Sequence, residues 1–289
     1  MIEWGLLGAG LVLAFANGAN DNPKGVATLY GAGSLSYSRA LTLATLSTAA
    51  GSLASVVLAT ELVRAFSGKG LIPAELLDAS FLTAVASAAA CTVLAATRFG
   101  LPISTTHAIV GSLVGAGAIF AGPALNISAL GGAFFLPLAL GPLLAVVLAW
   151  ALSRSGLASG RALGLDASSC LCAESVPVAV GPGGAAAAMA LSVDVSHEQD
   201  CEGRNAVKLN FRSVVNGGHL LSASTVGFAR GLNDTPKILG LLVGGAVVEP
   251  AMGALAITLA MALGGLVAAR RVTETLSHRL TPMSHAQGL

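Results

Sequence analysis

One ten-residue pattern occurs twice in the chain, and this duplication limits the folds open to it. The pattern reads Phe-Ala-Asn-Gly-Ala-Asn-Asp-Asn-Pro-Lys at 15–24 and Phe-Ala-Arg-Gly-Leu-Asn-Asp-Thr-Pro-Lys at 228–237. The copies lie 213 positions apart (15 to 228), and at this offset residues 15–62 match residues 228–275 at 16 of 48 positions. A fixed internal offset indicates a duplicated structural unit. Each unit places an Asn-Asp pair, a proline and a lysine after an apolar run.

The composition places this duplicated unit in a lipid bilayer. The chain is 54% hydrophobic and 10% charged, with a mean hydropathy of +0.80, whereas soluble domains carry about 25% charged residues. The net charge of +1 gives no reason to expect a nucleic acid partner. The first apolar run follows Met1-Ile2-Glu3 without a basic segment, which favours a retained membrane span over a cleaved signal peptide. We therefore expect an integral membrane protein with several spans.

The apolar runs predict an all-α, polytopic fold. They cover residues 4–20, 40–60, 79–97, 106–121, 130–152, 214–229 and 250–269, with a shorter piece at 238–248. A straight span needs about 20 apolar residues, so the shorter runs predict broken or re-entrant helices. We assign residues 1–152 to a first transmembrane repeat and residues 213–289 to a second, incomplete one.

Residues 153–212 are polar and mixed in charge, and we expect them to form an extramembrane loop without a core of its own. A short amphipathic stretch at 205–215 is expected to lie on the surface. The loop contains Cys170, Cys172, His197 and Cys201. Their spacing is open to a zinc site, to a disulfide in an oxidising compartment, or to cysteines without a shared role. The last interpretation is favoured, and zinc is a side hypothesis.

The repeated motif carries polar groups that a membrane core disfavours. Asp21 and Asp234 follow apolar runs, and an aspartate at the bilayer centre costs about 2.5–3.5 kcal/mol. Pro23 and Pro236 are expected to interrupt their helices and free backbone carbonyls. Such carbonyls, with Asn and Asp oxygens, suit a small cation such as Na⁺ or a proton carrier. Interrupted segments at equivalent positions of two halves are typical of a secondary transporter's binding site, and a plain helix end with a turn is the alternative.

A second polar string lies at 98–107 and reads Arg-Phe-Gly-Leu-Pro-Ile-Ser-Thr-Thr-His. Its Gly-Leu-Pro ends one segment, and Ser104, Thr105 and Thr106 fall in the first turn of the next helix. The unpaired N–H groups and the positive dipole end of that turn, flanked by hydroxyls, predict a site for a phosphate-sized anion. The alternative is an ordinary N-cap, with His107 as a packed core histidine.

Three strings together resemble the PiT family of inorganic phosphate transporters. They are Gly18-Ala-Asn-Asp21, Gly100-Leu-Pro-Ile-Ser-Thr-Thr-His-Ala-Ile-Val-Gly111 and Gly231-Leu-Asn-Asp234, and they span nearly the whole chain. The resemblance implies symport of inorganic phosphate with Na⁺ or H⁺, and no other cofactor. It also implies two inverted repeats around a central site, often a homodimer, and a place in the bacterial cytoplasmic (inner) membrane.

The resemblance also implies roles for individual residues. It assigns the coupling cation to Asn20, Asp21, Asn233 and Asp234, and phosphate to Ser104, Thr105 and Thr106. The chain departs from the family pattern where a glutamate is usual in the second helix of each repeat, because Ser47 and Ala260 stand there. It also has Asp-Asn-Pro-Lys and Asp-Thr-Pro-Lys in place of the usual Asp-Val-Ala-Asn. The lysines of these strings, Lys24 and Lys237, are expected as further phosphate partners, with snorkelling to the membrane surface as the alternative.

The family pattern includes a second Ser-Thr-Thr-His element. At the offset of 213, the equivalent of Ser104 would fall near residue 317, beyond Leu289. We therefore expect the chain to be a fragment, or half of the anion site to come from elsewhere.

Three other functions are alternatives to phosphate symport. A permease for sulfate or another oxyanion belongs to the same class of protein. An intramembrane enzyme would use Asp21 and Asp234 as a carboxylate pair, but it leaves the repeated Asn, Pro and Lys without a purpose. A purely structural subunit conflicts with the cost of two buried polar clusters. We expect a transporter and not an enzyme.

Overall fold

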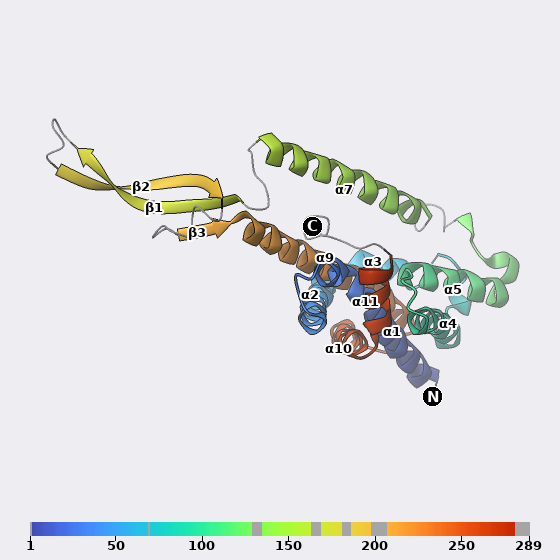
Figure 1. Ribbon diagram of the computed structural model, residues 1–289. Helices are drawn as coiled ribbons and strands as arrows, with labels where there is room; N and C mark the ends of the chain where they lie inside the picture. Colours follow the sequence, from blue (N-terminus) through green and yellow to red (C-terminus); the bar gives the residue numbers. More distant parts are fainter. Residues whose placement is uncertain are drawn as a thin grey trace. The chain divides into compact units, whose positions relative to one another are not determined.

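The computed structural model divides the chain into two compact units (Figure 1). The described residues are 2–68, 70–128, 135–162, 169–180, 186–197 and 207–280. The first unit is Met1–Ala139 with Leu220–Leu289, and the second is Leu140–His219. Helices α7 and α9 each have residues in both units.

The first unit is a bundle of helices. In chain order these are α1 (Ile2–Gly31), α2 (Tyr37–Leu58), α3 (Thr60–Ala65), α4 (Ala79–Arg98), α5 (Thr105–Phe120), α9 (Phe211–Gly244), α10 (Pro250–Ala268) and α11 (Arg270–Glu274). Short 3₁₀ turns lie at Ala74–Leu76 and Gly122–Ala124, and a π-helical turn at Thr275–Arg279 follows α11. Helix α1 packs against α2, α4 and α10, and α4 packs against α5. Helix α1 therefore has neighbours from both halves of the sequence.

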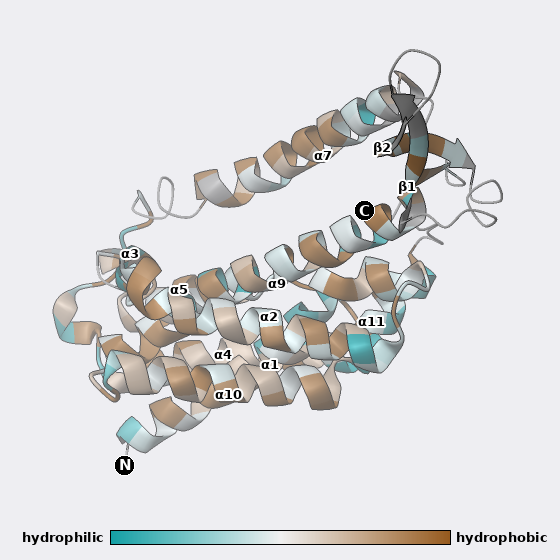
Figure 2. Ribbon diagram, turned by 90° about the vertical axis from the view of Figure 1, so that its left-hand side faces the viewer, coloured by the Kyte–Doolittle hydropathy of each residue, from teal (hydrophilic) through white to brown (hydrophobic). Residues whose placement is uncertain are grey.

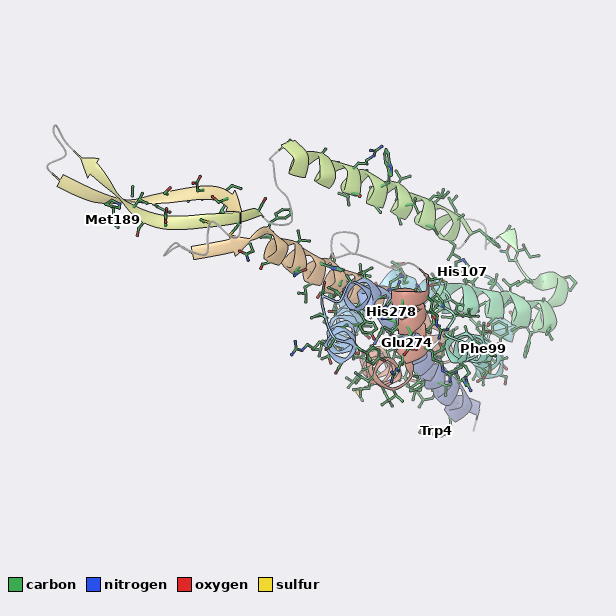
Figure 3. All side chains as sticks on the ribbon, in the orientation of Figure 1. Trp4, Phe99, His107, Met189, Glu274 and His278 are labelled. Atoms are coloured by element: carbon green, nitrogen blue, oxygen red, sulfur yellow. The ribbon has the colours of Figure 1, made fainter. Side chains whose placement is uncertain are left out.

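The first unit is apolar on its surface as well as in its core. Its fully buried side chains include Leu13, Phe81, Ile109 and Leu242, while hydrophobic residues also run along α2, α4 and α10 (Figure 2). Trp4, near the start of α1, is exposed (Figure 3). Helices that are hydrophobic on all sides are expected where lipid is the solvent. The chain is an integral membrane protein.

Four helices among the described residues are long and apolar enough to cross a membrane. They are Tyr37–Leu58, Ala79–Arg98, Leu138–Gly156 and Pro250–Ala268, while the apolar helix α5 is shorter. The helices expected at 40–60, 79–97 and 250–269 are thereby confirmed, as is the described part of the helix expected at 130–152, and with them the all-α character of the membrane part.

The prediction that proline interrupts the two motif helices is wrong. Helix α1 runs unbroken through Pro23, and α9 is a single helix of 34 residues that contains Pro236. The runs at 214–229 and 238–248 are therefore one helix. Proline removes one donor and its ring crowds the carbonyl four positions earlier, at a cost of about 3 kcal/mol, but its fixed φ is compatible with a helix. Packing on both sides of the motif offsets the loss.

The duplication seen in the sequence is also present in the helix boundaries. Helix α1 ends at Gly31 and α9 ends at Gly244, while α2 begins at Tyr37 and α10 begins at Pro250. Each pair is separated by the same 213 positions that separate the two motifs. The second repeat of the described chain therefore reproduces the first two long helices of the first repeat.

Glycines in one repeat pack against the backbone of the other, and they do so reciprocally. A Cβ at Gly18 would lie 1.9 Å from the carbonyl oxygen of Met261, and a Cβ at Gly231 would lie 1.9 Å from that of Thr48. Because Gly18 corresponds to Gly231 and Thr48 to Met261, these are two copies of one contact. Such reciprocal contacts are those of two units related by a two-fold axis.

A second reciprocal pair confirms this packing. A Cβ at Gly51 would lie 1.9 Å from the carbonyl oxygen of Phe228, and a Cβ at Gly264 would lie 1.9 Å from that of Phe15. The motif helix of each repeat thus packs against the second helix of the other repeat. This arrangement brings the two motifs together inside the bundle.

The second unit contains most of α7 (Leu136–Ala162) and a three-stranded antiparallel sheet. Its strands are β1 (Ser169–Val180), β2 (Ala186–His197) and β3 (Val207–Asn210), in the order β2-β1-β3. The sequence reading of 153–212 as a loop did not predict these strands. The alternation of Leu191-Ser-Val-Asp-Val-Ser196 is a signal of period two that indicates a strand. The stretch at 205–215 contains β3 and the start of α9 rather than one surface segment.

Two of the cysteines of the second unit, Cys170 and Cys172, lie on β1. Cys170 and Cys172 are buried together, and the Cys170 thiol donates to Asn210 Oδ1 at 3.1 Å. Cys172 is disulfide-bonded, so its sulfur is not a free thiolate for a metal. The backbone of His197 ends β2, opposite Ser169, while its side chain and Cys201 lie outside the described residues. No group of three metal-ligating side chains occurs among the residues described.

Candidate functional site

The two repeated aspartates lie in one polar cluster inside the first unit. Asp21 on α1 and Asp234 on α9 are both buried. The side-chain amide of Asn17, one turn before Asp21, donates to both carboxylates: its Nδ2 lies 3.0 Å from Asp21 Oδ2 and 3.4 Å from Asp234 Oδ2. Each half of the chain therefore supplies one carboxylate to a shared site.

Each aspartate forms an ion pair with the lysine of its own motif. Lys24 donates to Asp21 Oδ1 and to the carbonyl oxygen of Ile103. Lys237 Nζ lies 3.0 Å from Asp234 Oδ1 and 2.6 Å from Thr106 Oγ1. The side chains of Lys24 and Lys237 are only 15% and 6% exposed. The lysines therefore lie inside the cluster, and they do not snorkel to the membrane surface.

Arg230 adds a third positive charge to the cluster. It holds the position in α9 that Asn17 holds in α1, and its guanidinium lies 3.8 Å from Asp21 Oδ2. Its Nε is buried and has no hydrogen-bond partner among the described residues, and the same is true of Asn17 Oδ1. Leaving a buried donor or acceptor unpaired costs about 1–3 kcal/mol. These two atoms are therefore available to a ligand.

Asn17 and Arg230 were not predicted as members of the site, although their positions in the sequence indicate it. Each is a polar residue inside an apolar run, four positions before the aspartate of its motif. Residues four apart lie on the same face of a helix. The helical periodicity alone would have placed both beside the aspartates.

The first turn of α5 contacts this cluster through two of its three hydroxyl side chains. Thr105 is buried, with Oγ1 3.3 Å from Asp21 Oδ2, and Thr106 accepts from Lys237. Ser104 is exposed and caps the helix, accepting from the His107 N–H at 3.3 Å. The interpretation of His107 as a packed core residue is wrong, because His107 is exposed.

The asparagines that precede the two aspartates differ in their surroundings. Asn20 is fully buried, and its Nδ2 lies 3.0 Å from both Thr97 Oγ1 and the carbonyl oxygen of Leu101. Its Oδ1 accepts from the N–H of Ile103 at 3.0 Å. Asn20 therefore holds the connector between α4 and α5 (residues 99–104) in place. Asn233 is exposed.

The charges of this central cluster favour an anionic ligand. We use "central cluster" for Asn17, Asp21, Lys24, Thr105, Thr106, Arg230, Asp234 and Lys237. It contains three cationic and two anionic side chains, a net charge of +1. Buried charge is costly unless it is paired, and both carboxylates already have a cation. The surplus cation, the unpaired Nε of Arg230 and the hydroxyl of Thr106 are what an oxyanion would bind.

Comparison with known proteins identifies the family. The sequence profile of the phosphate transporter family matches residues 17–289. The chain belongs to the phosphate transporter family. Members of this family are transporters, so the alternative of an intramembrane aspartyl enzyme does not hold for this chain.

Individual relatives agree with this assignment. A proposed phosphate permease of Pyrococcus abyssi is 36% identical over 118 residues, which are 39% of this chain and 28% of that protein. The inorganic phosphate transporter 2-1 of Arabidopsis thaliana, a chloroplastic protein, is 32% identical over 129 residues, which are 42% of this chain and 21% of that protein. The chain thus matches less than a third of the length of either relative.

One solved structure has the same fold. Titled "The sodium-dependent phosphate transporter", it superposes with a TM-score of 0.67 at 18% identity, over 99% of this chain and 80% of that protein. At this identity the likeness shows the fold alone.

Proposed function

We propose that the central cluster binds inorganic phosphate, and that the chain serves cation-coupled phosphate transport by alternating access. The observation that carries this proposal is the surplus positive charge of the cluster, provided by Arg230 beside two lysine–aspartate pairs. Phosphate offers several oxygens to these donors at once, and arginine suits the planar, two-point recognition of phosphate. Membership of the phosphate transporter family supports the same substrate.

The contacts of the lysines suggest how phosphate and cation are coupled. Phosphate oxygens compete with Asp21 and Asp234 for the ammonium groups of Lys24 and Lys237. A carboxylate that loses its lysine in a buried site needs another positive charge. Na⁺ or a proton supplies that charge, with Asn17 Oδ1 as a further oxygen ligand for Na⁺. Each ligand then strengthens the binding of the other, as thermodynamic linkage requires.

The packing of the two repeats supports alternating access. The reciprocal glycine contacts place small residues where α1 meets α10 and where α9 meets α2. We propose that the repeats are inverted in the membrane, and that one rocks against the other around the central cluster. Asn20, Asn233 and Ser104 are proposed to act by shaping this site, rather than as direct ligands of the ion or of phosphate.

The exposed Asn233 supports a further part of this proposal. Its counterpart Asn20 is covered by the connector that leads into α5. We propose that an equivalent connector and helix cover Asn233 in the transporting assembly. The expected form of that assembly is a homodimer in the bacterial inner membrane. A permease for sulfate or another oxyanion remains the alternative, because tetrahedral oxyanions present similar oxygens.

The test is uptake of radiolabelled phosphate into proteoliposomes that contain the full chain. A Na⁺ gradient and a H⁺ gradient are imposed in separate experiments, with arsenate and sulfate as competitors. We expect one gradient to drive uptake that arsenate inhibits and sulfate does not. Uptake that sulfate inhibits and arsenate does not would indicate that another oxyanion is the substrate. If neither this chain nor one extended by a second Ser-Thr-Thr-His element takes up phosphate, the proposal is wrong.

A further inference from the structure

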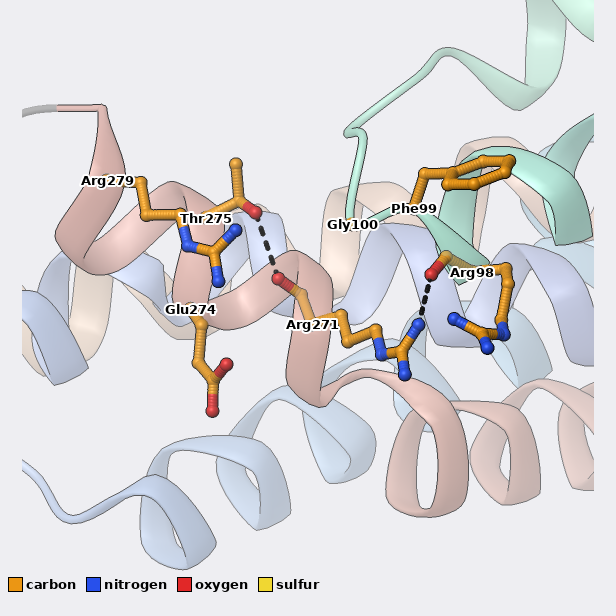
Figure 4. A pocket seen from close by; sticks show the side chains of 7 residues that line it. All are labelled: Arg98, Phe99, Gly100, Arg271, Glu274, Thr275 and Arg279. Atoms are coloured by element: carbon orange, nitrogen blue, oxygen red, sulfur yellow. Dashed lines mark hydrogen bonds between the residues drawn. The ribbon is translucent and has the colours of Figure 1, made fainter.

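A second concentration of positive charge lies outside the central cluster. It surrounds a cavity of about 310 Å³ between the end of α4 and the turn that follows α11 (Figure 4). The guanidinium groups of Arg98, Arg271 and Arg279 line this cavity. None of these arginines belongs to the repeated motif, and the proposed transport mechanism does not use them.

The backbone around this cavity is fixed by two features. Gly100, on its wall, has a φ of +73°, a conformation that side chains other than glycine rarely adopt. A Cβ at Gly100 would lie 3.0 Å from Thr275 Oγ1 and 3.1 Å from the carbonyl oxygen of Arg271. The Arg271 guanidinium also donates to the carbonyl oxygen of Arg98 at the end of α4. These contacts therefore fix the backbone that encloses the cavity.

The charges on the cavity wall are not balanced by its own residues. Its acidic residue, Glu274, accepts from Arg270 Nε at 2.9 Å, and Arg270 does not line the cavity. In the described part of the chain, Arg98 and Arg279 have no ion-pair partner. Three guanidinium groups around a small cavity suit a phosphate group, which arginine binds through two parallel hydrogen bonds.

The cavity lies where two membrane helices end. Arg98 is the last residue of the span Ala79–Arg98, and Arg271 follows the end of the span Pro250–Ala268. Beside it, Phe99 and Leu101 are 74% and 54% exposed. Phe99 and Glu274, which line the cavity, are both labelled in Figure 3. Exposed apolar side chains next to arginines are typical of the depth at which lipid headgroups lie.

We propose that this cavity binds a phosphate group at the membrane surface, carried either by an anionic phospholipid or by inorganic phosphate. The same connector that forms its wall at Gly100 is held further along by Asn20 and Lys24. A phosphate group in the cavity therefore stabilises the segment that positions the hydroxyls of α5.

The test compares two double variants of the full chain. Arg98→Gln with Arg279→Gln removes two charges from the cavity and leaves the central cluster intact. Arg64→Gln with Arg154→Gln removes two exposed charges elsewhere and is the matched control. Equal thermal unfolding of both variants and the wild type shows that the fold is kept. If the cavity double variant does not fold, Arg279→Gln alone replaces it.

Two measurements distinguish the sources of the phosphate group. Native mass spectrometry measures how much phosphatidylglycerol the purified protein retains, relative to phosphatidylcholine. Equilibrium dialysis with radiolabelled inorganic phosphate, on protein in phosphatidylcholine nanodiscs, counts phosphate sites. Loss of one charge-assisted contact weakens binding about tenfold, so we expect the cavity variant to lose at least that much in one measurement while the control is unchanged.

A loss in the phosphatidylglycerol measurement identifies a lipid headgroup. Loss of one class of sites in the dialysis identifies inorganic phosphate. If the cavity variant matches the wild type in both measurements, or if the control loses as much, the proposal is wrong. Neither measurement needs transport, so failure of the proposed transport function leaves this test intact.

Discussion

The two copies of the repeated motif pack in the same way but differ in charge. Gly18 and Gly231 make the same contact with the opposite repeat, and each aspartate pairs with the lysine three positions on. Against this common frame, Asn17 in one copy corresponds to Arg230 in the other. The duplication has kept the packing and the ion pairs, and has diverged in charge. That divergence gives the central cluster its net charge of +1.

The motif copies also differ in size, and their neighbours compensate. Asn22 packs against Gly265, where a Cβ would lie 2.1 Å from its Nδ2. Its counterpart Thr235 is smaller, and faces the larger Ser52, whose hydroxyl lies 2.6 Å from that of Thr235. A change in one copy is therefore matched by a change in the facing helix, because close-packed interiors tolerate little change in volume.

The largest expected effect tests what the copies share. Gly18→Ala and Gly231→Ala should each destabilise the protein by about 3 kcal/mol, the upper end of the usual cost of overpacking, because the added Cβ meets a backbone carbonyl that cannot move aside. Thermal unfolding in detergent measures this. Gly8→Ala and Gly111→Ala are controls, because nothing lies within 4 Å of a Cβ there. A marked difference between Gly18→Ala and Gly231→Ala would contradict the reciprocal packing.

The next largest effect tests the two asparagines, whose surroundings differ between the copies. Asn20→Ala should cost about 2–3 kcal/mol, because it leaves buried partners in the connector unpaired. Asn233→Ala should change stability by less than about 0.5 kcal/mol, as is usual at an exposed position. Chemical denaturation of the two variants checks the contrast. Equal costs would mean that Asn233 is covered in the protein as Asn20 is.

Much of the fold could be predicted from the sequence, and so could several members of the site. Hydropathy predicted the membrane helices, and the repeat singled out the two Asp-Lys pairs. The continuity of α1 and α9 could not be read from Pro23 and Pro236, because tertiary packing overrides the local preference. The role of Asn20 depends on residues about 80 positions away in the connector, and no local pattern reports such contacts.

A smaller effect separates the two lysines. Lys237→Gln should raise the half-saturating phosphate concentration for uptake by about 10- to 100-fold, the worth of one or two charge-assisted hydrogen bonds. Lys24→Gln should raise it less, because the second partner of Lys24 is the backbone carbonyl of Ile103, whereas that of Lys237 is the hydroxyl of Thr106, itself a proposed phosphate ligand. Concentration series of labelled phosphate in proteoliposomes measure both. A larger effect of Lys24→Gln would mean that Lys24, and not Lys237, is the main lysine ligand of phosphate.

The smallest expected effect concerns the hydroxyls of α5. Thr106→Val removes the hydroxyl partner of Lys237 and should weaken phosphate binding by about tenfold, the lower end of the value of one hydrogen bond to a charged group. Thr105→Val removes a donor to Asp21 and should alter the dependence of uptake on the cation more than on phosphate. Both variants keep the size of the side chain. If both alter only the phosphate dependence, Thr105 belongs to the anion site.

The most direct test of the central claim is phosphate binding by variants at Arg230, the residue that gives the cluster its positive charge. Equilibrium dialysis of labelled phosphate compares the wild type with Arg230→Asn, which restores the residue type of the first motif, and with Arg230→Lys, which keeps the charge. We predict that Arg230→Asn binds at least about tenfold more weakly, and that Arg230→Lys retains most of the affinity. Equal binding by Arg230→Asn and the wild type would contradict the account.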